Sequence, residues 1–292
     1  MSEFFFPGIS VGIYEKALPA HLTWRERLAM AAEAGFAFVE MSLDPSDERL
    51  SRLLWTAAER RDLRRAVEES GITIRTMCLS AHRVYPLGCG SESIRQQGET
   101  ILRQALDLAG DLGIRIVQIA GYDTLPDETS DEASRSRYAE SLAQGVQWAA
   151  ARAVMMGLEN QEMGCIDSPT TAVKLITAIN SPYLKLYMDV GNLVVKGLDV
   201  THEIEAARGH LIGVHVKDAR PGVPRRVPFG EGDVPFDAVF RQLAAMSFAG
   251  PMMIEMWNED RDDALAICAQ ARGWIESRLL EAGFSQARQI LS

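Results

Sequence analysis

Short apolar segments alternate with longer amphipathic segments along most of the chain. Apolar runs rich in valine, isoleucine and methionine predict buried strands, whereas apolar residues spaced three and four positions apart predict helices. Strands that alternate with helices in this way are typical of a parallel sheet. We expect eight strands, at residues 10–14, 38–42, 73–79, 114–119, 154–159, 185–189, 212–216 and 251–255.

Polar residues and glycines mark the ends of several predicted helices. Thr56 followed by Glu59 is a capping-box pattern, and the helix that it opens should end at residues 70–71. Ser168 before Pro169 predicts an N-cap with proline at the first helical position. Other helices are expected from Ser93 to about residue 113, over residues 131–151, from Asp237 onward and from Asp262 to about residue 282.

The number of strand–helix repeats decides the architecture. Eight repeats with no glycine-rich phosphate loop after the first strand favour a closed (β/α)8 barrel, or TIM barrel, over an open doubly wound α/β sheet. Such barrels typically contain about 250 residues in one domain. The 292 residues contain no internal linker and no segment whose sequence is repeated. We therefore predict a single domain over residues 1–292.

The composition argues against a membrane protein and against a nucleic-acid-binding protein. No segment approaches the roughly 20 consecutive apolar residues that cross a bilayer, and a formal net charge of -10 argues against a nucleic-acid groove. The four cysteines have no C-x-x-C spacing and are predicted to be reduced thiols. Residues 1–7 lack the basic segment of a secretion signal. These features predict a cytoplasmic protein without a membrane or nucleic-acid partner.

Ionisable residues stand at the ends of four consecutive predicted strands. These are Glu159, Asp189, His215 and Glu255. Strand ends on one side of a barrel build its active site, and three carboxylates gathered around an imidazole would repel one another without a cation. The set suits Zn²⁺, Mn²⁺, Mg²⁺ or Co²⁺. Taken singly, each carboxylate is more often a salt-bridge partner, and a lone histidine on a strand is more often structural.

Motifs along nearly the whole chain resemble one known family. They are residues 11–19, 38–42, 47–53, 77–83, 120–123, 189–193, 215–218, 227–232 and 250–257. These segments are similar to the L-xylulose-5-phosphate 3-epimerases, also described as L-ribulose-5-phosphate 3-epimerases or hexulose-6-phosphate isomerase-like proteins. That family belongs to the xylose-isomerase-like TIM barrel superfamily. The sequence departs from its relatives at residues 160–163, and Asn192 stands where epimerases of free ketoses carry a histidine.

The resemblance implies a reaction and a cofactor. The expected reaction interconverts L-xylulose 5-phosphate and L-ribulose 5-phosphate by removing a proton from C3 and returning one to the opposite face. One divalent metal ion, with Zn²⁺ expected first and Mn²⁺, Mg²⁺ or Co²⁺ as alternatives, would be held by Glu159, Asp189, His215 and Glu255. Glu159 and Glu255 would also serve as the acid and base.

The resemblance also implies a ketose phosphate substrate and a homodimer or larger assembly. Residues that we expect to bind the sugar or its phosphate are Glu40, Ser80, His82, Arg83, Asn192, Lys217 and Arg220. Arginine and lysine side chains suit phosphate oxygens. Glu40 is expected to contact sugar hydroxyls, to orient a metal ligand or to form a salt bridge at the rim of the barrel.

Three alternatives share features with this interpretation. An aldose–ketose isomerase on the same barrel would move hydrogen between C1 and C2 instead of inverting C3. A metal-dependent abasic-site endonuclease would need more histidines than the five present and a basic surface. A sugar-binding protein without catalysis would hold no stoichiometric metal.

Overall fold

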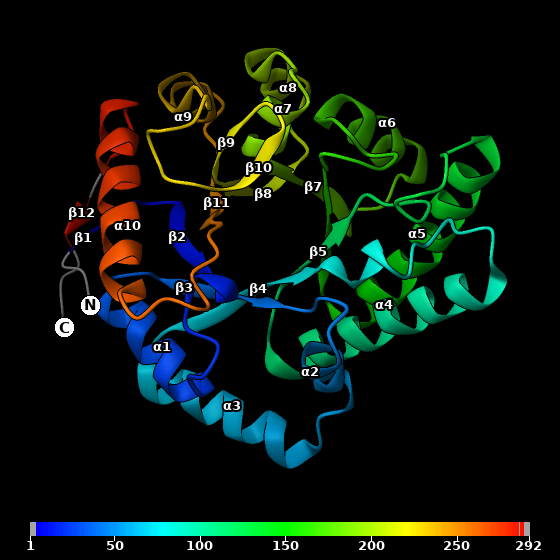
Figure 1. The fold of residues 1–292 in the computed structure, drawn as a ribbon, viewed down its shortest axis with the longest axis horizontal. Coiled ribbons are helices and arrows are strands. Elements are labelled where there is room, and N and C mark those ends of the chain that lie inside the picture. The colour runs from blue at the N-terminus through cyan, green and yellow to red at the C-terminus, as the bar shows by residue number, and fades with distance from the viewer. Residues whose placement is uncertain (1–3, 286, 289–292) are drawn as a thin grey trace. The chain divides into compact units, whose positions relative to one another are not determined.

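The computed structural model describes residues 4–285 and 287–288, and within them each of the predicted strands is present (Figure 1). Eight strands run in the order β11-β2-β3-β4-β5-β6-β7-β8 and close into a barrel. The predicted (β/α)8 fold is therefore confirmed. The strands are β2 (Ile9–Tyr14), β3 (Phe38–Ser42), β4 (Thr73–Leu79), β5 (Ile116–Ala120), β6 (Met155–Glu159), β7 (Leu184–Asp189), β8 (Leu211–Val216) and β11 (Gly250–Ile254).

Helices follow the strands, and their ends confirm most of the predicted caps. Thr56 and Glu59 exchange the expected capping-box bonds, and Gly113 ends its helix in a left-handed conformation with φ of 77°. Ser168 caps the helix that starts with Pro169. The helices are α1 (Trp24–Glu33), α2 (Asp47–Leu50), α3 (Ala57–Ser70), α4 (Glu92–Leu112), α5 (Glu132–Arg152), α6 (Pro169–Ile179), α7 (Val190–Val195), α8 (Val200–Ala206), α9 (Phe236–Ala245) and α10 (Ala264–Glu281).

Some predicted helix starts are displaced by one or two residues. The predicted start at Ser93 is wrong by one residue, because α4 begins at Glu92 after the cap residue Ser91. Helix α9 begins one residue before Asp237, and α10 begins two residues after Asp262. Neither of these two helices has a side-chain hydrogen bond at its cap, so the sequence offers no strong mark of where they begin.

Two antiparallel pairs lie outside the barrel and were not predicted. Strands β9 (Asp218–Arg220) and β10 (Val223–Val227) form a hairpin directly after β8. Strand β1 (Phe4–Phe5) pairs with β12 (Ala287–Arg288). The hairpin carries a proline and several arginines and lacks regular alternation of apolar and polar residues, which explains why the pattern did not reveal it.

The chain divides into two compact units. The first unit contains residues up to Glu40, residues 65–73 and the chain from Asp189 onward, and the second contains residues 41–64 and 74–188. In the first unit, β11 pairs in parallel with β2 and with β8. In the second, β4, β5, β6 and β7 pair in parallel in chain order.

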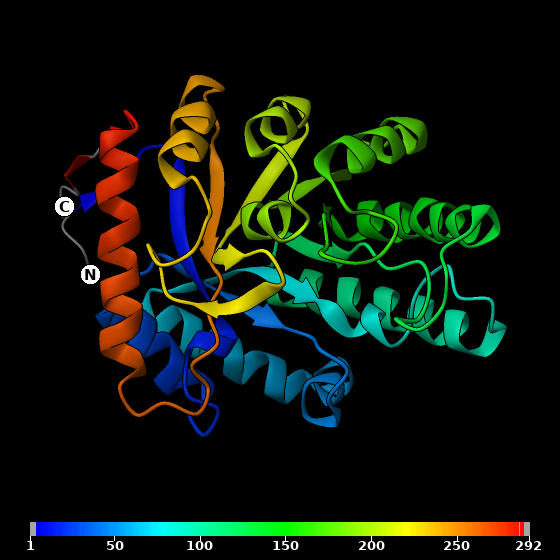
Figure 2. The same cartoon turned by 45° about the horizontal axis from the view of Figure 1, so that its top comes forward.

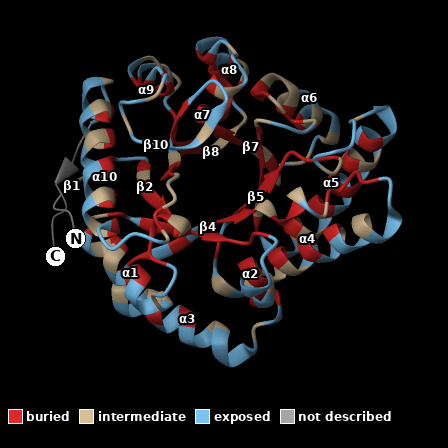
Figure 3. Ribbon diagram, viewed as in Figure 1, coloured by how far each residue is buried: buried red, intermediate tan, exposed pale blue. Residues whose placement is uncertain are grey.

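Each unit buries its strands beneath helices. Helices α4 and α5 pack against each other in the second unit, as α9 and α10 do in the first (Figure 2). The strands are largely buried, whereas the outward faces of the helices are exposed (Figure 3). Among the described residues, no helix is both long and apolar enough to cross a membrane. The four cysteines form no disulfide.

Candidate active site

A buried lysine joins two of the predicted metal ligands in the first unit. The Lys217 Nζ atom lies 2.7 Å from Asp189 Oδ2 and 3.2 Å from Glu255 Oε2. The three side chains are at most 10% exposed. Two carboxylates removed from water in this way need a compensating positive charge, and the lysine ammonium supplies it.

Local structure explains why these three groups meet. Strands β8 and β11 pair so that Ile254 lies opposite Val216, and the Glu255 N–H donates to the Val216 carbonyl at 2.9 Å. Glu255 and Lys217 therefore leave neighbouring strands at the same level. Asp189 ends β7 and caps α7, where its Oδ1 accepts a hydrogen bond from the Asn192 N–H at 3.0 Å.

Gly191, in the first turn of α7, leaves room for the lysine side chain. A Cβ atom at position 191 would lie 2.5 Å from Lys217 Cγ and 2.9 Å from Lys217 Cε. A larger residue would push the lysine stem away from Asp189. The segment from Asp189 to Asn192 therefore combines a capping carboxylate with a glycine that the neighbouring lysine requires.

The second buried pair of the first unit joins His215 to Glu40. The His215 Nε2 atom lies 2.9 Å from Glu40 Oε1, and both side chains are fully buried. A carboxylate that holds one ring nitrogen fixes the orientation of an imidazole, as is usual for histidines that bind metals. Of the roles expected for Glu40, the geometry favours orienting His215.

Positive charge also surrounds Glu255 and Trp257. Burial raises the pKa of Glu255, but Lys217, His215 and Arg225 outweigh this effect and hold it below the usual range. The Arg225 guanidinium lies 5.3 Å from the centre of the Trp257 ring, and Lys217 Nζ lies 5.9 Å from it. Trp257 therefore contacts two cations beside a proposed catalytic carboxylate.

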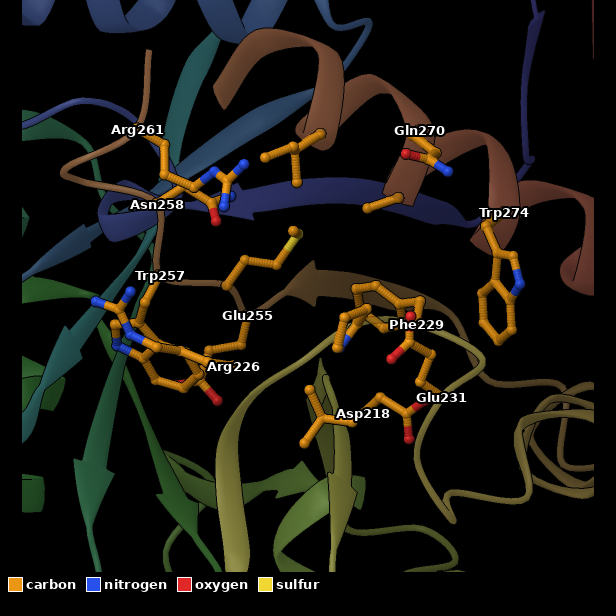
Figure 4. Close-up of a pocket in the computed structure, with 15 residues that line it drawn as sticks. Asp218, Arg226, Phe229, Glu231, Glu255, Trp257, Asn258, Arg261, Gln270 and Trp274 are labelled. Carbon is orange, nitrogen blue, oxygen red and sulfur yellow. The ribbon is translucent and has the colours of Figure 1, made fainter. Parts of the chain in front are cut away.

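A cavity of about 490 Å³ opens beside Glu255 in the first unit. Figure 4 shows Glu255, Trp257 and Arg226 at one end of it and Phe229 and Trp274 at the other. The cavity lies between the segment after β11, the loop that follows β10 and α10. Its volume is in the range of small-molecule sites.

Asp218 holds the loop that forms one wall of this cavity. Its buried carboxylate accepts hydrogen bonds from the N–H groups of Ala219, Gly230, Gly232 and Val234, at 2.9 to 3.4 Å. A Cβ atom at Gly232 would lie 2.0 Å from Asp218 Oδ1, so the loop requires glycine there. One carboxylate thereby fixes the backbone on both sides of the hairpin.

Arg220 and Arg83 are engaged in structural contacts. The guanidinium of Arg220 donates to the backbone carbonyl of Glu231 and so holds the loop that follows β10 against β9. Arg83, in the second unit, donates to the Tyr122 hydroxyl at 2.7 Å and lies 3.4 Å from Glu162. Their predicted contacts with substrate stay predictions.

His82, another predicted substrate contact, is buried in the second unit. Its Nε2 lies 3.2 Å from the Gly98 carbonyl oxygen, and burial lowers its pKa to about 4. The ring is therefore neutral near pH 7 and donates its proton to the backbone. Ser80 is half-buried at the start of the 3-10 turn Ser80–Arg83.

Glu159 ends β6 in the second unit and accepts two amide hydrogen bonds. Gln118 Nε2 lies 2.6 Å from Glu159 Oε2, and Gln161 Nε2 donates to the same oxygen. The Tyr122 hydroxyl donates to Gln161 Oε1 at 3.0 Å. Sequence reasoning missed these three partners, although a glutamine within the apolar strand β5 was a visible signal.

Comparisons with known proteins relate this geometry to a group of enzymes. The family described as xylose isomerase-like TIM barrel matches residues 28–278. The chain is 44% identical over 279 residues to the L-ribulose-5-phosphate 3-epimerase UlaE of Escherichia coli O139:H28 (strain E24377A / ETEC), covering 96% of this chain and 98% of that one. The protein of the same name from Salmonella heidelberg (strain SL476) is also 44% identical, with the same coverage.

Solved structures share the fold at lower identity. A structure of L-ribulose 3-epimerase has a TM-score of 0.77 and 22% identity, and the match covers 94% of this chain and 95% of that one. D-psicose 3-epimerase with D-tagatose from Clostridium cellulolyticum H10 has a TM-score of 0.78 and 17% identity, over 92% and 99% of the two chains. These matches support the barrel assignment.

Replacing the buried lysine tests the charge balance. In the presence of a chelator, Lys217→Met should lower the free energy of unfolding by about 3 to 5 kcal/mol, because it leaves Asp189 and Glu255 buried without their cation. Arg208→Met removes a cation from an exposed pair with Glu205 and should change stability little. Urea unfolding of both variants measures the difference. Equal stability of Lys217→Met and the unmodified protein would contradict this account.

His82 should make stability depend on pH. Its pKa of about 4 in the folded protein lies below the ordinary value of 6.5, so the unfolded chain binds the proton more readily between these values. Stability is therefore lost as the pH falls from 6.5 to 4, by on the order of 3 kcal/mol. His82→Gln should remove this contribution from a urea series at different pH. An unchanged pH dependence in the variant would refute the assignment.

Proposed function

The chain belongs to the xylose isomerase-like TIM barrel family, and from this premise we propose that it is a metal-dependent 3-epimerase of L-xylulose 5-phosphate and L-ribulose 5-phosphate. One observation carries the proposal: identity of 44% to enzymes named L-ribulose-5-phosphate 3-epimerase extends over 96% of the chain. The likeness is therefore not confined to one shared segment. The buried carboxylates at the strand ends supply the groups that such a reaction needs.

The proposed metal site consists of Glu159, Asp189, His215 and Glu255. Glu159, Asp189 and His215 are buried and each offers one ligand atom. In the β6–β7 register Glu159 lies opposite Tyr187, and Asp189 follows Tyr187 two residues later along the chain. Oxygen and nitrogen ligands without thiolates suit Zn²⁺, with Mn²⁺, Mg²⁺ or Co²⁺ as alternatives.

The buried charges fit a bound cation. Asp189 and Glu255 carry two negative charges and share only one positive charge, that of Lys217. His215 is held by a carboxylate, as metal-binding histidines usually are. When bound, a divalent metal would polarise the ketose carbonyl as a Lewis acid. Lys217 would then supply further positive charge beside the substrate oxygens.

Glu159 and Glu255 are the proposed acid and base. One carboxylate removes the proton from C3, and the bonding electrons pass into the C2–C3 enediolate. The carboxylic acid on the opposite face then delivers a proton to C3, and the new C–H bond has the inverted configuration. The two residues exchange roles in the reverse direction, so no other reactant is consumed.

The cavity beside Glu255 is the proposed substrate site. Arg225 contacts Trp257 at its edge and Arg226 lines it, so these two arginines are suitable partners for the phosphate. Lys217, which is already paired with Asp189 and Glu255, stays a proposed substrate contact. Asn192 and Ser80 stay proposed sugar contacts. Arg83, Arg220 and His82 are less suited, because each has a hydrogen-bonded partner within its own unit.

We further propose that residues 1–292 form one catalytic domain that works in the cytoplasm as a homodimer on a small ketose phosphate. The four cysteines, which form no disulfide, are consistent with a reducing compartment.

Deuterium labelling tests the reaction directly. Incubation with L-xylulose 5-phosphate in D₂O should yield L-ribulose 5-phosphate with deuterium at C3, as observed by NMR. Glu159→Gln and Glu255→Gln should each lower kcat by roughly 10² to 10⁴-fold, as expected on removal of a general acid or base. The exposed Glu140→Gln variant serves as the matched control. Deuterium at C1 but not at C3 would instead indicate the aldose–ketose isomerase.

A further inference from the structure

We propose that a chain of hydrogen bonds from Arg83 through Tyr122 and Gln161 positions the carboxylate of Glu159. Tyr122 would then be a positioning residue for a group that it does not touch. The inference rests on the proposed function, because that function gives Glu159 its catalytic task. All four residues belong to the second unit.

The chain begins on the turn after β4 and ends on the last residue of β6. Arg83 Nη2 donates to the Tyr122 hydroxyl at 2.7 Å, and that hydroxyl donates to Gln161 Oε1 at 3.0 Å. Gln161 Nε2 then donates to Glu159 Oε2. Tyr122, Gln161 and Glu159 are 3%, 4% and 6% exposed, so water has little access to the two bonds that join them.

Each bond fixes the direction of the next. A guanidinium has donors and no acceptor, so the Tyr122 proton cannot point to Arg83 and is directed to Gln161. Burial, together with the nearby Glu162 carboxylate, raises the pKa of Tyr122 above its ordinary range, so the proton stays on the hydroxyl. An amide that accepts through its oxygen must present its NH₂ group on the other side, which here faces Glu159.

Arg83 is itself held in two ways. Its guanidinium lies 3.4 Å from Glu162 and packs 5.2 Å from the centre of the Tyr122 ring. It therefore cannot easily leave the hydroxyl that it orients. These contacts explain a partly buried arginine beside Tyr122 without a phosphate ligand.

Gln118, on strand β5, also donates a hydrogen bond to Glu159. Its Nε2 meets Glu159 Oε2 at 2.6 Å, which is the same oxygen that Gln161 contacts. The two oxygens of Glu159 are therefore not equivalent, and the plane of the carboxylate is fixed. A proton acceptor works efficiently only when it is held in the right position relative to C3. These hydrogen bonds would hold the Glu159 carboxylate in such a position.

Tyr122→Phe tests the proposal with the smallest change. It keeps the ring under Arg83 and removes only the hydroxyl that orients Gln161. We expect kcat for L-xylulose 5-phosphate to fall about 10 to 100-fold, with KM nearly unchanged, because Gln161, the partner of the proposed metal ligand Glu159, loses the hydroxyl that orients it. Tyr138→Phe is the matched control, because the Tyr138 hydroxyl is also buried in the second unit but donates to the Ala120 carbonyl at 3.1 Å.

A double substitution tests whether Tyr122 acts through Gln161. Gln161→Met should lower kcat at least as much as Tyr122→Phe, and the double variant should be no slower than Gln161→Met alone. Losses that multiply would overturn the proposed chain, as would a Tyr122→Phe variant with the kcat of the unmodified enzyme. The assays are run well below the measured Tm of each variant, so that differences in kcat do not reflect partial unfolding.

Metal affinity gives a readout that does not depend on turnover. Isothermal titration with Zn²⁺ should show affinity about tenfold weaker for Tyr122→Phe and unchanged for Tyr138→Phe. Equal affinity in both variants would contradict the positioning of Glu159. An active unmodified enzyme with no effect of Tyr122→Phe would refute this inference alone, whereas an unmodified protein that neither binds metal nor epimerises the substrate would refute the proposed function and this inference with it.

Discussion

The structure depends most on the compensation of buried negative charge at the carboxyl ends of its strands. Lys217 contacts both Asp189 and Glu255 with its ammonium, and none of the three side chains has much access to water. An unpaired carboxylate in such a place would be costly. The glycine at position 191 and the register of β8 with β11 both bring the lysine to these carboxylates.

The other polar groups of the site are fixed in a similar manner within their own units. Glu40 holds the ring of His215, and the carboxylate of Asp218 organises the loop after β10 beside the cavity. In the second unit, Gln118 and Gln161 hold Glu159. Each chemically important side chain is thus paired with another buried group that limits its motion, as preorganised catalysis requires.

The barrel was predictable because its strands are short apolar runs separated by helices, several of which have clear caps. The strand ends also predicted Glu159, Asp189, His215 and Glu255 as candidates, since parallel strands place their carboxyl ends on one side. The hairpin β9–β10 was missed, because charged residues and a proline obscure its pattern. The roles of Gln118, Tyr122 and Gln161 depend on side-chain direction across separate strands, which spacing along one chain does not reveal.

The central claim is that the buried carboxylates and His215 hold a catalytic metal ion. A crystal structure of the Zn²⁺-loaded protein, with anomalous data collected at the zinc absorption edge, tests it most directly. The account predicts one strong peak with ligands from Glu159, Asp189, His215 and Glu255 at roughly 2.0 to 2.2 Å. A crystal without zinc at these residues, in which Lys217 still bridges Asp189 and Glu255, would contradict it.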